Sequence, residues 1–224
     1  MRLLRALRSR LGRRNDRGHT LVEMMVATAL LGVIMGSAYS AVAVMQHQDI
    51  VTSDRNSGNI EAQIIADRIT KDIRTAISPS PTVPPFASAD VQDVTFYAGL
   101  SDQAVAGPTK LHAYVSLVPG TNVYVFHEDA TKPDAGGAPG NWTYSGQPLN
   151  RIDGRYLDIS QPIFTYYDAN GNQIPTPIPA AATTQLGSID AVGISLRVRI
   201  RPGSPTVVIN TKIHIRNVDY NPNS

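Results

Sequence analysis

The longest apolar run of the chain lies near its N-terminus and contains no charged residue. It extends from Met24 to Met45. As a helix rising about 1.5 Å per residue, it would cover roughly 33 Å, which is enough to cross a hydrocarbon core of about 30 Å. The apolar core of a cleaved secretion signal has only about 7 to 15 residues. We therefore expect a membrane-spanning helix here.

Beyond this run, apolar residues recur every three or four positions, which indicates an amphipathic continuation of the same helix. Asp67 with Lys71, and Arg68 with Asp72, have the i,i+4 spacing of opposite-charge pairs. We expect one helix over about residues 20–77, with a kink at Asn56-Ser57-Gly58 as an option, because the prolines that follow forbid its continuation. The expected buried stripe consists of Ile60, Ala62, Ile64, Ile65, Ala66, Ile69, Ile73, Ala76 and Ile77.

In the rest of the chain, apolar and polar residues alternate with the period of β-strands. Residues 129–147, rich in glycine and proline, indicate a surface loop. Because the amphipathic helix needs an apolar partner, we expect an α+β fold in which the long helix packs on an antiparallel sheet. The expected strands are residues 94–96, 111–117, 123–126, 156–167, 192–200 and 207–215.

Charge is distributed unevenly along the chain, whose net charge is +2. Residues 1–18 contain seven of the 20 basic residues and only one of the 18 acidic ones. The remainder is mildly acidic, so a nucleic-acid-binding function for the whole protein loses its main support. The basic cluster should keep the N-terminus in the cytoplasm and place everything after Met45 outside. Cysteine is absent, which excludes disulfides and thiolate chemistry.

A specific motif precedes the apolar run: Arg17-Gly18-His19-Thr20-Leu21-Val22-Glu23. It resembles the N-terminal signature of type IV prepilins, in which a basic leader ends in glycine, and threonine, leucine and glutamate follow before an apolar helix. The resemblance implies that a membrane-embedded aspartyl peptidase, the prepilin peptidase, cuts after Gly18 and methylates the new amino group. His19 would become the N-terminus, where the family usually has phenylalanine.

Glu23 would be the fifth residue of the processed chain. An isolated carboxylate costs on the order of 2.5 to 3.5 kcal/mol at the centre of a membrane span and less near its edge. The ammonium group of His19 on a neighbouring subunit could neutralise it, which would fix the axial register of the subunits. Alternatively, Glu23 only stabilises the first helical turn through the helix dipole.

Small residues recur every four positions within the span, at Thr28, Gly32, Gly36 and Ser40. They form a stripe on one helical face, and such a stripe lets two helix backbones approach closely. We therefore predict that this face packs against helices of other subunits. The alternative is that small residues are simply common in membrane helices.

The C-terminal half resembles J-type pseudopilins and their pilus counterparts more loosely, in Ile213-His214-Ile215-Arg216-Asn217 and in the turn from Asp168 to Asn172. No cofactor and no metal are expected. Calcium at Asp168, Asn170 and Asn172 is an alternative, since some pseudopilins bind calcium. However, the loop lacks the glutamate expected further on, and Asn170-Gly171 is a common hairpin turn. His127-Glu128-Asp129 is a second polar cluster to consider for metal binding.

Two runs of basic residues near the C-terminus occupy alternate positions, so each run shares one strand face. Like charges facing each other across a sheet are unfavourable. A solvated face explains them, and the sharper hypothesis is a docking surface for an acidic neighbouring subunit or a DNA strand. The runs are Arg197, Arg199 and Arg201 on one strand, and Lys212, His214 and Arg216 on the next.

The chain contains no nucleophile elbow, phosphate-binding glycine loop or His-Glu-x-x-His motif. We therefore interpret it as a non-enzymatic subunit, a minor pilin or pseudopilin, of a type IV pilus or type II secretion pseudopilus in the bacterial inner membrane. The alternative is an uncleaved, single-span membrane anchor with an extracytoplasmic binding or sensor domain. The expected segments are a leader (1–18), the membrane half of the helix (19–45), its amphipathic half (46–78) and a β-rich extracytoplasmic domain (79–224).

Overall fold

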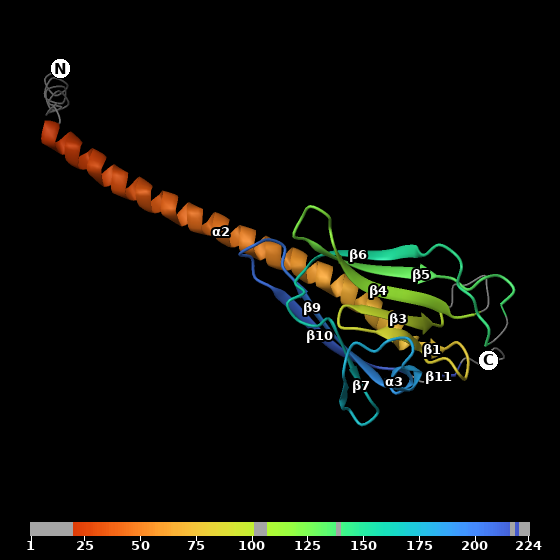
Figure 1. Cartoon of the computed structure of the whole chain (residues 1–224). Helices are drawn as coiled ribbons and strands as arrows, with labels where there is room; N and C mark the ends of the chain where they lie inside the picture. The colour runs from red at the N-terminus through yellow and green to blue at the C-terminus, as the bar shows by residue number, and fades with distance from the viewer. Residues whose placement is uncertain (1–19, 101–106, 138–139, 216–217, 220–224) are drawn as a thin grey trace, which may run out of the picture. The chain divides into compact units, whose positions relative to one another are not determined.

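The computed structural model divides into two compact units, Met1–Ile50 and Val51–Ser224 (Figure 1). Each unit is described by itself. The predicted leader with its processing residues Gly18 and His19 lies outside the described residues, and so does Arg216. The structure describes residues 20–100, 107–137, 140–215 and 218–219.

Helix α2 (Leu21–Arg74) is continuous over 54 residues and confirms the single long helix expected from the sequence. It passes through the segment Asn56-Ser57-Gly58 without interruption. Gly58 is buried there, and a Cβ atom at this position would lie 3.3 Å from Cγ2 of Val207. The glycine therefore allows a close contact with the sheet and is not the site of a break in the helix.

The helix ends three residues earlier than the expected Ile77. The N–H and the side-chain hydroxyl of Thr75 both donate to the carbonyl oxygen of Asp72, at 3.0 and 2.8 Å, which tightens the last turn. Ile77 instead belongs to strand β1 (Ile77–Ser78), which pairs in parallel with β11 (Val218–Asp219). The amphipathic half of the helix, predicted for residues 46–78, therefore ends at Arg74.

The second unit contains a large antiparallel sheet, so the predicted α+β architecture is confirmed. Its strand order is β2-β3-β4-β5-β6-β9-β7-β8, and β10 pairs with β9. A short helix, α3 (Thr183–Gly187), precedes β9. The strands are β2 (Phe86–Ala89), β3 (Asp93–Ala98), β4 (Thr109–Leu117), β5 (Tyr124–Thr131), β6 (Leu149–Leu157), β7 (Phe164–Tyr167), β8 (Gln173–Ile174), β9 (Ala191–Val198) and β10 (Val207–His214).

The strand expected over residues 156–167 is wrong, because the chain forms two strands there. β6 ends at Leu157, which pairs with Val198 of β9, and β7 begins only at Phe164. The N–H groups of Ile163 and Phe164 both donate to the carbonyl oxygen of Val91. This contact directs the chain across the sheet, so β6 and β7 pair with different ends of β9.

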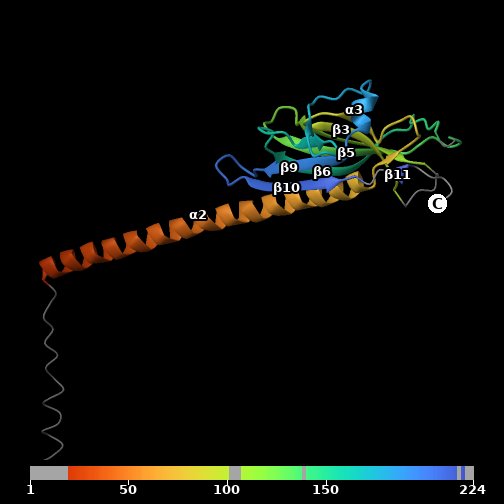
Figure 2. The same cartoon turned by 90° about the horizontal axis from the view of Figure 1, so that it is seen from below.

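The hydrophobic core lies between one face of the sheet and the helix residues of the second unit (Figure 2). The helix contributes Ile65, Ile69 and Ile73, each at most 1% exposed. Ile60 and Ile64 are 59% and 57% exposed, so their predicted burial is wrong. At about 100° per residue, they lie about 140° to 180° around the helix from Ile69. From the sheet, Phe86, Phe96, Leu111, Phe126, Phe164, Val192, Ile194 and Leu196 are fully or almost fully buried.

Close packing between helix and sheet depends on one glycine of β6. A Cβ atom at Gly154 would lie 2.1 Å from Cδ1 and 2.6 Å from Cγ1 of Ile65. No real side chain fits at such distances, so Gly154 provides the space into which Ile65 inserts. Next to it, the carboxylate of Glu61 accepts the N–H of Arg155 at 2.7 Å.

Candidate functional site

The first turn of α2 places Glu23 in a defined position. The hydroxyl of Thr20 accepts the N–H of Glu23 at 3.2 Å, and the carbonyl of Thr20 accepts the N–H of Met24. Thr20 is thus the N-cap, and Thr20-x-x-Glu23 has the spacing of a capping box. This cap was not predicted from the sequence, although Thr20 and Glu23, three positions apart, have the capping-box pattern that indicates it. The predicted register carboxylate therefore sits in the first turn, where the helix dipole also favours a negative charge.

The small-residue stripe is exposed and open. A Cβ atom at Gly32 or Gly36 would meet nothing within 4 Å. The hydroxyl of Thr28 donates to the carbonyl of Met24 at 3.0 Å, and that of Ser40 donates to the carbonyl of Ser37 at 2.8 Å. Because these donors are satisfied within the helix, the stripe can enter an apolar environment at little cost.

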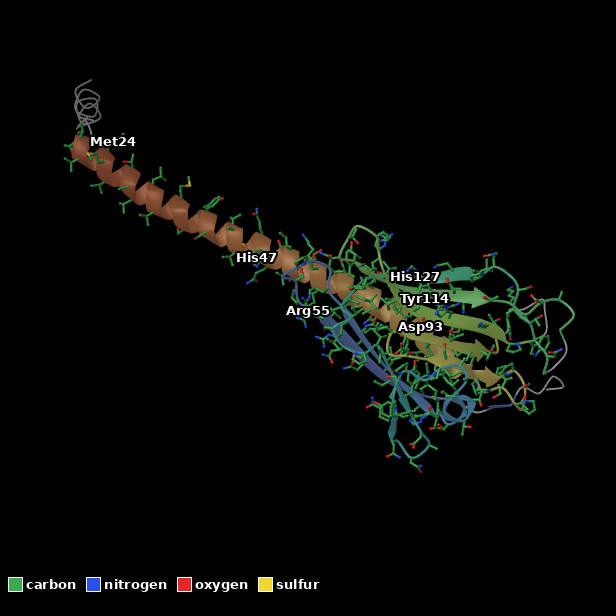
Figure 3. All side chains as sticks on the ribbon, in the orientation of Figure 1. Met24, His47, Arg55, Asp93, Tyr114 and His127 are labelled. Carbon is green, nitrogen blue, oxygen red and sulfur yellow. The ribbon has the colours of Figure 1, made fainter. Side chains whose placement is uncertain are left out.

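The apolar surface of this helix segment is not covered by any other described residue of its unit. Among the described residues, α2 is the one helix whose length and composition suit a membrane span. All its residues from Leu21 to Ile50 are exposed. Between Met24 and His47 the side chains project on all sides of the helix (Figure 3). A helix that is apolar all round is suited to lipid or to other apolar helices.

Residues 13–39 match the family model of the prokaryotic N-terminal methylation motif. The match covers the arginine-rich end of the leader, Glu23 and most of the small-residue stripe. Together with the helix-on-sheet fold, it supports the class of type IV pilin-like proteins. Within that class, it supports a pilin or pseudopilin-like subunit anchored in the membrane by its N-terminal helix. Neither the curated proteins nor the solved structures include a match to this chain.

In the register of β9 and β10, the predicted docking residues Arg197, Lys212 and His214 share one face of the hairpin, whereas Arg199 and Arg201 follow the end of β9. Arg199 forms a salt bridge with Asp158, with 3.1 Å between Nη2 and Oδ2. The ammonium group of Lys212 lies 3.9 Å from the centre of the Tyr167 ring. In the register of β9 and β10, Arg197 is opposite Val208 and Lys212 is opposite Gly193, so no like charges face each other there. Docking of an acidic subunit or DNA stays a prediction.

Arg201 instead connects the hairpin tip between β9 and β10 to the helix. It donates to Asp54 through Nε, at 3.2 Å, and through Nη2, while the hydroxyl of Ser204 donates to the same carboxylate. Asp54 is only 5% exposed. These hydrogen bonds hold the pKa of Asp54 below its ordinary value of 3.8, and the one from Arg201 has the largest effect. Asp54 and Gly58, one turn apart, thus fix this hairpin to α2.

Replacing Asp54 with asparagine is expected to destabilise the second unit at neutral pH, because a neutral amide pairs less well with the guanidinium group of Arg201. The depressed pKa means that the stabilisation is complete above pH 3.8 and is lost as the pH falls through the folded-state pKa. Urea unfolding followed by Trp142 fluorescence should therefore give a lower midpoint at pH 7 and a smaller difference near pH 3. The control is Asp67→Asn, a change at an exposed position. Equal midpoints for both variants at pH 7 would show that the contact between Asp54 and Arg201 does not stabilise the unit.

A cluster of four ionisable residues, in which the two acidic side chains are buried, joins α2 to β5 and β6. Arg151 Nη1 lies 3.0 Å from Asp72 Oδ2 and 3.3 Å from Glu128 Oε1, and Arg68 Nε lies 3.2 Å from Asp72 Oδ2. The last contact confirms the predicted i,i+4 pair. Burial, with the nearby Asp72 carboxylate, raises the pKa of Glu128 to about 8. Asp72 is therefore the carboxylate of the pair, and Glu128 carries a proton at neutral pH.

The three residues His127, Glu128 and Asp129, considered for metal binding from the sequence, do not share one face of β5. Glu128 faces the core, whereas its neighbours lie on the opposite face of β5. There the His127 ring stacks on Tyr114 with 4.9 Å between centroids, and Tyr114 stacks on His112, which hydrogen-bonds to Asp93 at 2.9 Å (Figure 3). This ladder links three strands. In the described part of the chain, no group of three His, Asp or Glu residues is arranged to hold a metal ion.

Replacing Glu128 with glutamine is expected to flatten the dependence of stability on pH. Between pH 4.5 and about 8 the folded chain keeps a proton that the unfolded chain has released, so the free energy of unfolding falls as the pH rises through this window. The amide has no proton to lose, so the fall should disappear. Denaturant unfolding at pH 5 and pH 8 measures it, with Asp129→Asn on the outer face as the control. An unchanged fall in the Glu128→Gln variant would assign it to another group.

The turn proposed as a calcium loop is built around Asp168. Its carboxylate accepts the backbone N–H groups of Asn170 and Asn172 at 2.9 and 2.8 Å, and the side-chain amide of Asn172 at 3.0 Å. These hydrogen bonds lower the pKa of Asp168, and the one from the Asn172 side chain has the largest effect. Gly171 adopts φ +81°, which suits a tight turn between β7 and β8. The turn thus accounts for these residue types without a cation.

Proposed function

We propose that this chain is a non-enzymatic structural subunit, a minor pilin or pseudopilin, of a type IV pilus or a type II secretion pseudopilus. One observation carries the proposal: the Thr20-capped first turn presents Glu23 at the start of an exposed, uncharged helix, inside the segment that matches the methylation motif. The α+β domain attached to this helix fits a subunit body.

In the proposed mechanism, the chain is inserted in the inner membrane with its N-terminus in the cytoplasm, and prepilin peptidase cuts between Gly18 and His19. Cleavage removes the arginines and creates a positively charged amino group. That group pairs with the Glu23 carboxylate of a neighbouring subunit, where both charges leave water. The open stripe at Gly32 and Gly36 then lets the helices approach closely. Assembly in this scheme requires prior processing.

The test is N-terminal sequencing of the protein purified from membranes of its host. Cleavage predicts a chain that begins at His19, and Gly18→Ala should leave the leader attached. Gly12→Ala, a glycine change within the leader, is the matched control and should leave cleavage unchanged. A wild-type chain that retains its leader would refute the proposal and favour the uncleaved membrane anchor.

A further inference from the structure

Among the described residues, strand β10 has one edge without a partner strand. The carbonyl of Ile163 accepts the N–H of Ser195 in β9, and that of Tyr156 accepts the N–H of Arg199 just after β9. The backbone groups at these positions therefore point away from β10. In antiparallel pairing the directions alternate. The register therefore turns the N–H and C=O groups of Val208, Asn210 and Lys212 away from β9, and within the described residues they have no backbone hydrogen-bond partner.

A groove lies beside this edge, between β10 and the last turns of α2. Figure 2 shows the strand next to this part of the helix. Its volume is about 680 Å³. Ile209 and Thr211 line it from the strand, and Ala66 and Thr70 line its helical side. Side chains of an added strand alternate between two faces, so every second one would enter this groove. The free edge of β10 can thus form main-chain hydrogen bonds with an added strand, and the groove can accommodate every second side chain of that strand.

The rim of the groove is predominantly basic. Lys71 and Arg74, both exposed, line it from the helix, against one acid, Asp67. Among the described residues, neither of the two basic side chains forms a salt bridge. Lys212 adds an exposed basic side chain on β10 itself, whereas the ring of His214 contacts the carboxylate of Asp190 at 3.3 Å. Charge complementarity therefore favours an acidic occupant and disfavours the β10 edge of a second copy, which carries the same basic residues.

We propose that the free edge of β10 and its groove form a docking site for an extended, acidic segment of a partner protein, which adds to the sheet as a further antiparallel or parallel strand. This site lies in the second unit and does not include the first turn or the membrane half of α2, on which the proposed function rests. Edge strands of this length are ordinarily shielded, because they invite pairing with other chains. Here the edge has eight residues in β10 and a groove ready to receive side chains.

The test uses the full chain in detergent micelles and two capped octapeptides, one alternating valine with glutamate and the other alternating valine with lysine. The glutamate peptide should bind at least tenfold more tightly, as measured by calorimetry. The double variant Lys71→Gln/Arg74→Gln should lose this preference, whereas Lys132→Gln, which removes an exposed charge elsewhere, should keep it.

A second variant tests the main-chain contacts. Asn210→Pro removes an N–H that points away from β9, so the native hairpin should survive while the added strand loses a hydrogen bond and meets a steric block. Affinity for the glutamate peptide should fall at least tenfold, with an unchanged circular dichroism spectrum. Equal affinity for the two peptides, or a folded Asn210→Pro variant that binds as tightly as the wild type, overturns the proposal. Neither result bears on cleavage at Gly18.

Discussion

Replacing Glu23 with alanine is expected to reduce incorporation into filaments by up to about 100-fold. Without the carboxylate, the amino group of the next subunit would enter the assembled core unpaired. An unpaired charge costs on the order of 2.5 to 3.5 kcal/mol at the centre of a membrane span and less near its edge, and about 1.4 kcal/mol corresponds to a factor of ten. The amount of the chain in sheared filaments, relative to the amount in membranes, measures the effect.

The controls separate charge from shape and from helix capping. Glu23→Gln keeps the size of the side chain and removes its charge, so it should be almost as defective as alanine. Glu23→Asp keeps the charge and should be incorporated into filaments to an intermediate extent. Gln48→Ala, a change at an exposed polar position further along α2, should assemble normally. Normal incorporation of the Glu23→Gln variant would show that the carboxylate only stabilises the helix, as its position beside the Thr20 cap also allows.

Replacing Gly154 with alanine is expected to lower the free energy of unfolding of the second unit by about 2 to 3 kcal/mol. The new methyl group would overlap Cδ1 and Cγ1 of Ile65, which is 1% exposed and enclosed in the core. Overpacking of this kind typically costs about 1 to 3 kcal/mol, which lowers Tm by about 2 to 4 °C per kcal/mol in a unit of this size. Thermal unfolding of the full chain in detergent measures the change.

Gly146→Ala is the matched control, because a Cβ atom at Gly146 meets nothing within 4 Å. Its effect should stay within about 0.5 kcal/mol. Adding Ile65→Ala to Gly154→Ala should cost much less than the sum of the two single changes, since the smaller side chain vacates the space that the methyl group needs. Strict additivity in this cycle would place the cause of the destabilisation elsewhere than in the contact with Ile65.

The N-terminal part of the molecule could be predicted because its signals are local. The uncharged run from Met24 to Met45 and the spacing of Gly18, Thr20 and Glu23 need no knowledge of the rest of the chain. Hydrophobic periodicity also predicted the long helix, but not which side of it meets the sheet. Closely spaced isoleucines surround much of the helix, and only the contact with strands such as β6 distinguishes the buried Ile65 from the exposed Ile64.

The positions of the C-terminal basic residues could not be predicted, because their partners are distant in the sequence. Arg199 pairs with Asp158, 41 positions away, and Arg201 pairs with Asp54, 147 positions away. Alternation within a strand indicates a shared face only as far as the strand extends, and β9 ends at Val198. Both arginines follow that end, so local backbone direction and a carboxylate within reach determine where they point.

The hydroxyl groups along the membrane half of α2 have a consequence for the composition of the proposed filament. Thr28 and Ser40 already donate their hydrogen bonds to carbonyls of their own helix. In the proposed filament, this helix surface can discriminate between neighbouring helices only by shape complementarity. The axial register is set by the charge pair between Glu23 and the amino group of the next subunit. Subunits with unrelated bodies could then share a single core lattice, and the identity of each neighbour would be selected by contacts outside the membrane.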